Sequence, residues 1–290
     1  MTLDRPGLAS DWSLSGAQST GAGIAAQPRA IGSAGVAARR RGEASVVADL
    51  YESGSAKIRL PRTAGPGLQA VTLNTAGGLT GGDHLRYAAE AREGSHLTLA
   101  SQTAERAYRT QPGQVARLDV TLTVGPGATL EWLAQETILF DACALDRRIR
   151  VDMAPDATLL LVEPVVFGRV AMGERVLSGR FRDSQRLSRD GHLVYADETR
   201  IEGPVDRIVA AEAALGPNRA YATIIFSAPD AESRLSGLRA LIDPGEGGAS
   251  AFDGLISARI VSHNGYELRR RLMHVLREFR ESAPPRVWEM

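Results

Sequence analysis

The chain has 290 residues, 43% of them hydrophobic, and its 34 basic side chains balance 34 acidic ones. This balance gives no basic excess that would indicate a nucleic-acid partner, and the single cysteine excludes a disulfide or a thiolate metal cage within one chain. No apolar run is long enough to span a membrane, and the first 30 residues lack the apolar stretch of a signal peptide, so we expect a cytoplasmic protein.

The start of the chain has the composition of an unfolded segment. Residues 1–35 are rich in Gly, Ala and Ser, and Trp12, Leu14 and Ile24 are isolated large apolar side chains. So little apolar surface cannot offset the entropy of ordering the chain. We therefore predict a disordered tail over residues 1–40 and a single β-rich domain over residues 41–290.

From about Ala44 the pattern is typical of strands. Apolar and polar residues alternate over 118–124, and the Gly-Pro-Gly at 125–127 follows as a turn. The same alternation recurs over 148–153, and a second turn leads into an apolar run over 158–162. This period of two predicts half-buried strands joined by tight turns.

A weak internal repeat accompanies the strands. Similar turn-then-leucine segments end at Leu97, Leu130, Leu159 and Leu193, at steps of 33, 29 and 34 residues. The recurrence indicates stacked strand–turn–strand units, as in a solenoid or a layered sheet. Recurrent hairpins in any all-β protein would leave a similar echo, so both arrangements stay open at this stage.

Two helices are predicted near the C-terminus, with a strand over 255–262 between them. Ser227 has the position of a helix cap, and an apolar stripe follows over 235–242. The second helix begins at Asn264, with a glutamate three residues on as in a capping box. The three consecutive arginines at 269–271 fall largely off its apolar stripe, which favours a solvated face over a surface for a partner.

The glycine-rich segment 77–83 has the spacing of a phosphate-binding loop at Gly77 and Gly82. However, Asp83 stands where such a loop needs its lysine, and a carboxylate there would repel phosphate. We therefore expect no nucleotide binding, and we interpret the glycines as a sharp bend between strands.

Several acids lie among large apolar residues, where an unpaired carboxylate is costly to bury. The five histidines are scattered and show no metal-ligand spacing. The acids either pair with Arg106, Arg109 or Arg169 to hold the fold, or they line a path or interface whose hard oxygen ligands exchange a divalent metal quickly.

Six segments, in order, resemble the family of urease accessory proteins called UreD or UreH. The similarity runs from about residue 44 to the end of the chain. The segments are Ser53–Pro61, Asn74–Asp83, Glu131–Asp141, Phe167–Glu174, Asp183 with Arg189–Gly191, and Pro285–Trp288.

This resemblance implies a mainly β fold with two α-helices near the C-terminus. It also implies a urease maturation factor without enzymatic activity, which binds apo-urease, a UreF-like accessory protein and, through it, a UreG-like GTPase. No cofactor is expected to be tightly bound, and nickel would pass in transit. The GTP chemistry would belong to the GTPase, in agreement with the missing phosphate-loop lysine.

The family segments supply the candidate site residues. For a transient nickel path we propose Asp83, Glu136, Asp141, Glu163 and Glu174. An architectural role is expected for Asn74, Gly77, Gly78, Gly81, Gly82, Gln135, Phe167, Arg169 and Gly173. Cys143 is expected to fill a small buried apolar position.

Two other functions compete with the nickel scaffold. Clustered carboxylates could serve a β-fold hydrolase or metalloenzyme, provided that folding brings them within working distance. A passive chaperone that only reshapes urease would need no metal path at all.

Overall fold

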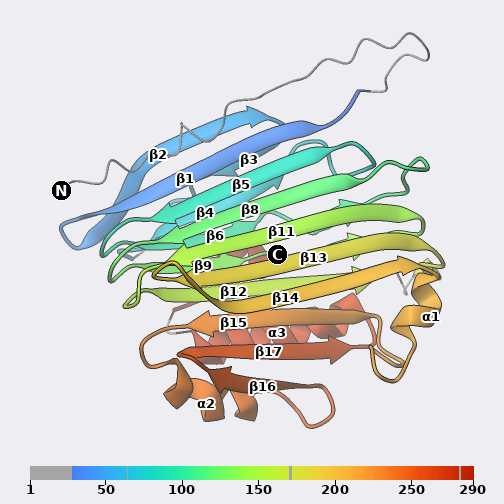
Figure 1. Ribbon diagram of the computed structural model, residues 1–290. Coiled ribbons are helices and arrows are strands. Elements are labelled where there is room, and N and C mark those ends of the chain that lie inside the picture. The colour runs from blue at the N-terminus through green and yellow to red at the C-terminus, as the bar shows by residue number, and fades with distance from the viewer. Residues whose placement is uncertain (1–27, 64, 170–171, 281) are drawn as a thin grey trace.

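The computed structural model describes residues 28–63, 65–169, 172–280 and 282–290. Within these residues a 7-stranded sheet and a 10-stranded sheet stack face to face, and the longest helix covers the outer face of the larger sheet (Figure 1). The fold is therefore mainly β and layered, as the sequence predicts.

Sheet A, the 7-stranded sheet, has five parallel strands in its centre and an antiparallel strand at each edge. In spatial order its strands are β14 (His192–Gly203), β13 (Gly179–Arg189), β11 (Cys143–Met153), β8 (Ala116–Val124), β5 (His84–Ala91), β1 (Ile31–Arg41) and β2 (Ala44–Gly54).

Sheet B, the 10-stranded sheet, contains a parallel block of four strands flanked by antiparallel ones. Its main path is β16 (Gly247–Phe252), β17 (Leu255–Ser262), β15 (Ala220–Ser227), β12 (Thr158–Phe167), β9 (Thr129–Leu133), β6 (His96–Ser101), β4 (Leu68–Asn74) and β3 (Ala56–Arg59). Two short strands, β10 (Thr137–Leu139) and β7 (Glu105–Ala107), pair with each other, and β10 also pairs with β12.

The chain alternates between the sheets from β4 to β13, so that successive turns of a coil stack on one another. Leu97 pairs with Leu130 and Leu130 pairs with Leu159, which places the predicted repeat leucines in one row of sheet B. The stacked-unit interpretation is confirmed for these three. It is wrong for Leu193, which lies in the antiparallel edge strand β14 and is 57% exposed. Leu68, which pairs with Leu97, is the first member of the row instead.

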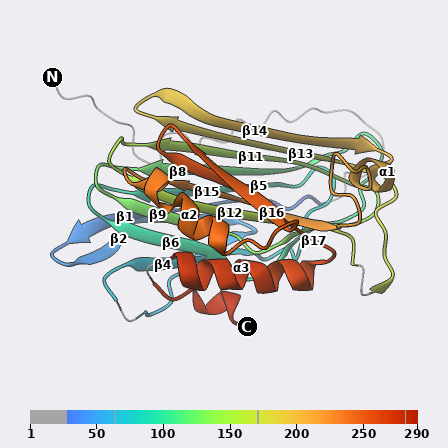
Figure 2. The same ribbon diagram turned by 90° about the horizontal axis from the view of Figure 1, so that it is seen from below.

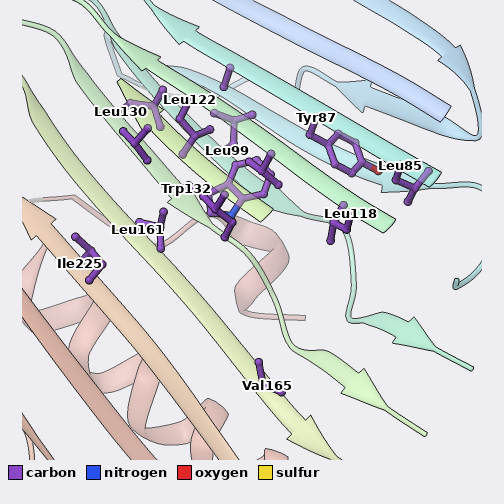
Figure 3. Packing of buried hydrophobic residues seen from close by; sticks show 14 of the residues in the cluster. Leu85, Tyr87, Leu99, Leu118, Leu122, Leu130, Trp132, Leu161, Val165 and Ile225 are labelled. Carbon is purple, nitrogen blue, oxygen red and sulfur yellow. The ribbon is translucent and has the colours of Figure 1, made fainter. Parts of the chain in front are cut away.

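The main hydrophobic core fills the space between the two sheets. Strands β8 and β11 bury every second side chain, as their alternation predicts. Leu122 of sheet A lies beside Leu130 of sheet B, and the Tyr87 ring of sheet A lies 6.5 Å from the Trp132 ring of sheet B (Figure 3). The parallel strand β12 reads as an apolar run instead, because one of its faces packs in this core and the other packs in the cluster under the helices.

A second apolar cluster lies between sheet B and the helices (Figure 2). Helix α3 (Gly265–Phe279) is capped by Asn264, whose side chain accepts a hydrogen bond from the Glu267 amide, so this prediction is confirmed. The other helical segments are α1 (Val205–Val209), η2 (Ala231–Arg234), α2 (Leu235–Ala240) and η3 (Arg286–Trp288). Within the described residues no helix is long and apolar enough to cross a membrane.

Three expectations need correction. Ser227 does not cap a helix: it ends β15, is fully buried, and accepts a hydrogen bond from Arg189. The arginines of α3 are not simply a solvated face, because Arg269 and Arg271 bind other elements of the fold. The folded domain also begins before residue 41, because β1 starts at Ile31 and buries Ala34 and Val36 completely. The predicted tail over residues 1–27 lies outside the described residues.

The leucine row generates a stability prediction. Replacing Leu130 with alanine leaves a cavity between the sheets, so we expect the free energy of unfolding to fall by about 2–5 kcal/mol. Leu193→Ala makes the same change at an exposed position and is expected to stay within about 0.5 kcal/mol of the parent. Equal losses in a urea titration of the two variants would contradict the stacked-coil account.

Candidate functional site

A buried ion-pair cluster lies between the two sheets. Arg147 of β11 is 1% exposed, and its guanidinium donates to both oxygens of Asp183 on β13, at 2.8 and 2.7 Å. It also donates to Glu163 of β12, across the interior in sheet B. The two carboxylates keep the pKa of the guanidinium above its ordinary value, so Arg147 stays charged.

Glu163 is held by two donors. Its Oε1 accepts from Trp132 Nε1 at 2.6 Å and its Oε2 accepts from Arg147. Arg147 also donates to the Thr137 hydroxyl at 3.1 Å. Burial, with Asp183 nearby, raises the pKa of Glu163 above its ordinary value. One guanidinium therefore serves two acids.

A second carboxylate, Glu105, occupies the first position of β7. Asn74, at the end of β4, donates to both of its oxygens at 3.1 and 3.3 Å, and the Arg106 amide donates at 3.2 Å. These donors are uncharged. Burial is the largest cause that raises the pKa of Glu105 to about 7 from its ordinary 4.5. Such a carboxyl releases its proton readily when a cation approaches.

A cavity of about 80 Å³ connects the two carboxylates. Its wall includes Asn74, Gly77 and Glu105, together with Thr137, Arg147 and Glu163. The remaining lining residues are Thr72, Leu73, Tyr87, Ser101, Gln102, Thr103, Ala104, Arg106, Leu118, Trp132, Ala134 and Gln135. Because its polar groups come from successive turns of the coil, stacking alone assembles this candidate site.

Four of the residues predicted from sequence meet at this cavity: Asn74, Gly77, Gln135 and Glu163. Glu136 is buried but its side chain reaches Arg269 of α3 at 3.4 Å. The other three acids proposed for a metal path, Asp83, Asp141 and Glu174, do not line the cavity.

Those three acids hold loops. Asp83 is 4% exposed and accepts from the Ala30 and Thr80 amides, both at 2.8 Å. Asp141 accepts from the amides of Leu177 and Ser178 and from Arg109. Glu174 accepts from Arg169 Nε at 2.8 Å. Two of the arginines considered from sequence, Arg109 and Arg169, are thus partners of these acids. A metal role for the three remains a prediction from the motifs, and their contacts favour loop closure.

The predicted architectural residues have local structural roles. A Cβ on Gly78 would lie 2.4 Å from the Tyr108 ring, and one on Gly81 would lie 2.5 Å from Gln114. Gly77, Gly82 and Gly173 have positive φ angles, which glycine adopts without strain. Phe167 is buried beside Tyr221, and the guanidinium of Arg169 stacks over Phe140 at 4.8 Å.

Cys143 is 3% exposed, and burial raises the pKa of its thiol to about 12. It therefore remains an un-ionised, packed side chain, as predicted. Within the described residues no group of three or more His, Cys, Asp or Glu side chains could hold a metal ion. Any cation in the cavity would thus contact few charged ligands at a time.

Comparisons with known proteins agree with the sequence motifs. The family model of the UreD urease accessory protein matches residues 30–289. The chain belongs to the UreD family. The UreD urease accessory protein of Azorhizobium caulinodans is 42% identical over 271 residues, which cover 93% of this chain and 100% of that protein.

Further UreD relatives are similarly close. The protein of Methylobacterium sp. strain 4-46 is 44% identical over 248 residues, covering 83% of this chain and 88% of the relative. That of Rhizobium leguminosarum bv. trifolii is 41% identical over 263 residues, which cover 90% of this chain and 96% of the relative. The match to the UreD family model begins earlier than the residue 44 expected from the motifs, at residue 30, one residue before β1.

Sequence reasoning missed two residues of the UreD-family cavity, Glu105 and Arg147. Glu105 lies in a short polar stretch, so its burial gives no signal in the sequence. Arg147 falls at an inward position of β11, between Leu145 and Ile149. An arginine in phase with buried side chains is the signal that could have revealed it.

Removing the cation of the buried cluster should be costly. Arg147→Gln leaves Glu163 and Asp183 without their shared charge, so we expect a loss of about 3–5 kcal/mol in the free energy of unfolding. Arg150→Gln, on the exposed side of the same strand, should change it by less than about 0.5 kcal/mol. Chemical denaturation measures both, and a tolerated Arg147→Gln would mean that the cluster does not hold the sheets together.

Glu105 should make stability depend on pH. Between about pH 4.5 and 7 the folded chain keeps a proton on Glu105 that the unfolded chain has released, so this group's contribution falls as pH rises through that window. Glu105→Gln should remove the fall, which amounts to about 1.4 kcal/mol per unit of pKa difference. Urea titrations at pH 4.5 and 8 measure it, with exposed Glu93→Gln as the control. Parallel pH profiles of parent and Glu105→Gln would refute the raised pKa.

Proposed function

We propose that this chain is a non-catalytic urease maturation factor that assists delivery of nickel to apo-urease. It would act in the cytoplasm with a UreF-like accessory protein and, through that protein, with a UreG-like GTPase. Membership of the UreD family supports the maturation role. The cavity lined by Glu105 is the observation that supports a route for the ion.

The chemistry of the cavity suits passage better than storage. Its ligands are hard oxygen and amide groups, which bind Ni²⁺ more weakly than thiolates or clustered imidazoles do. Glu105 has uncharged partners and a pKa of about 7, so it can exchange its proton for a cation near neutral pH. A weak, proton-exchanging ligand lets an ion enter and leave.

A carboxylate-based hydrolase fits the geometry less well. Both oxygens of Glu163 already accept hydrogen bonds from buried donors, and both oxygens of Asp183 accept from Arg147. A general acid or base needs an oxygen directed at the reacting group. These two carboxylates are therefore committed to the ion-pair cluster.

The test couples complex formation to metal delivery. Urease is co-expressed with its accessory proteins and with either the parent chain or Glu105→Gln, which keeps the size of the side chain and removes its charge. We expect the variant to join its partners in a pull-down and the matured urease to contain less nickel by elemental analysis. Glu174→Gln, a matched change outside the cavity, should leave more nickel in urease than Glu105→Gln does.

Two results would count against the cavity route. Full nickel content with Glu105→Gln in an intact complex would show that the ion does not depend on this carboxylate. Loss of the complex would assign Glu105 to folding or to a partner interface instead. The passive-chaperone function would gain support from the first result.

A further inference from the structure

Sheet B has a break in its hydrogen bonding beside the cavity. Strand β6 ends at Ser101 and β7 begins at Glu105, while β9 ends at Leu133 and β10 begins at Thr137. The two gaps, 102–104 and 134–136, are adjacent because β6 pairs with β9 and β7 with β10. Ala104, Ala134 and Gln135 from these gaps line the cavity.

The outer side of the second gap is covered by α3 and the C-terminal segment. Gln135 Nε2 donates to the Val287 carbonyl at 3.1 Å, and Trp288 Nε1 donates to the Leu133 carbonyl at 3.0 Å. Trp288 is 1% exposed and packs in the cluster between sheet B and the helices. One wall of the cavity is thus backed by this segment.

The guanidinium of Arg269 occupies an oxygen-lined position at this gap. It donates to Gln135 Oε1 at 3.0 Å, to both oxygens of Glu136 at 3.4 Å, and to the carbonyls of Trp288 at 2.8 Å and Val287 at 3.5 Å. It also stacks over the Trp288 ring at 5.2 Å. Amide, carboxylate and carbonyl oxygens around one cation are the ligand types of a hard divalent ion.

The carboxylate of Glu136 accepts weak hydrogen bonds for a buried acid. It is 8% exposed, and within the described residues its carboxylate accepts only the two long contacts from Arg269. Glu131, five residues earlier and 6% exposed, accepts from Arg280 at 2.6 Å on each oxygen and from Thr98 at 2.5 Å. The His96 ring at 3.2 Å and these close donors hold the pKa of Glu131 at about 2. Glu136 thus keeps coordinating capacity that Glu131 has used.

Glu136 is also a direct neighbour of the proposed route. The Glu105 amide donates to the Glu136 carbonyl at 2.9 Å. Alternation along the chain sends the side chain of Glu136 toward α3, while Glu105 and Thr137 line the cavity. An ion that leaves Glu105 toward the outer face of sheet B would therefore next meet the oxygens around Arg269.

We propose that this position is a second divalent-cation site and that Arg269 is its built-in competitor. The ligands would be the Glu136 carboxylate, Gln135 Oε1 and the Trp288 carbonyl. While the guanidinium is seated, its charge excludes a divalent ion; displacement of Arg269, together with α3 or the C-terminal segment, opens the site. The inference rests on the proposed function because it adds a gate to the same route.

Equilibrium dialysis of the isolated full-length chain against Ni²⁺ tests the site without urease. We expect Arg269→Gln to bind one more Ni²⁺ per chain than the parent at micromolar to millimolar metal. Arg270→Gln, the neighbouring arginine on α3, should bind the same amount as the parent. Adding Glu136→Gln to Arg269→Gln should abolish the gain. Arg269→Leu, which keeps an apolar side chain over Trp288, serves as a second variant should the first not fold.

No gain of Ni²⁺ with a folded Arg269 variant would overturn the proposal, as would a gain that persists with Glu136→Gln. Because the measurement involves neither urease nor partners, its failure leaves the cavity role of Glu105 standing. Conversely, full nickel content of urease with Glu105→Gln would refute the cavity route whatever the dialysis shows. The two hypotheses are therefore separable.

Discussion

The register of the stacked coil is the constraint on which the rest of the structure depends. Leu68, Leu97, Leu130 and Leu159 lie in one row because each turn of the chain pairs in register with the one before. A slip by one residue would turn every buried side chain of a strand outward. The same register brings Asn74, Glu105, Thr137 and Glu163 from four separate segments to one cavity. The same strand register therefore determines both the packing of the core and the assembly of the site.

These buried and half-buried acids differ in how many hydrogen bonds their oxygens accept from charged groups. This difference separates the acids that hold the fold from those that could bind a metal ion. Glu131 has short charged partners, and Glu163 shares Arg147 with Asp183, so both acids hold the structure. Among the described residues, Glu105 has uncharged donors and Glu136 has two long contacts to one arginine. Carboxylates left with this much capacity are the ones a passing cation could use.

Much of the fold could be predicted from the sequence because local rules agree with the final structure. Alternation identified β8 and β11, and the capping pair located the start of α3. The strand β1 was missed because it needs small residues: a Cβ on Gly32 would lie 2.3 Å from the Ala56 nitrogen. That requirement gives β1 the Gly- and Ala-rich composition of a tail. Ser227 was misassigned because a helix cap and a buried strand end carry the same short polar residue.

The site was predictable only in part because motifs identify segments and not the direction of each side chain. The motif residues Asn74, Gln135 and Glu163 reach the cavity, whereas Asp83 and Asp141 close loops. The positions of the Glu105 and Arg269 side chains are set by contacts between distant elements, which periodicity does not encode.

The most direct test of the cavity route is anomalous diffraction at the nickel edge from crystals of the chain grown with Ni²⁺. The account predicts a peak beside Glu105 inside the cavity; peaks confined to surface histidines would contradict it.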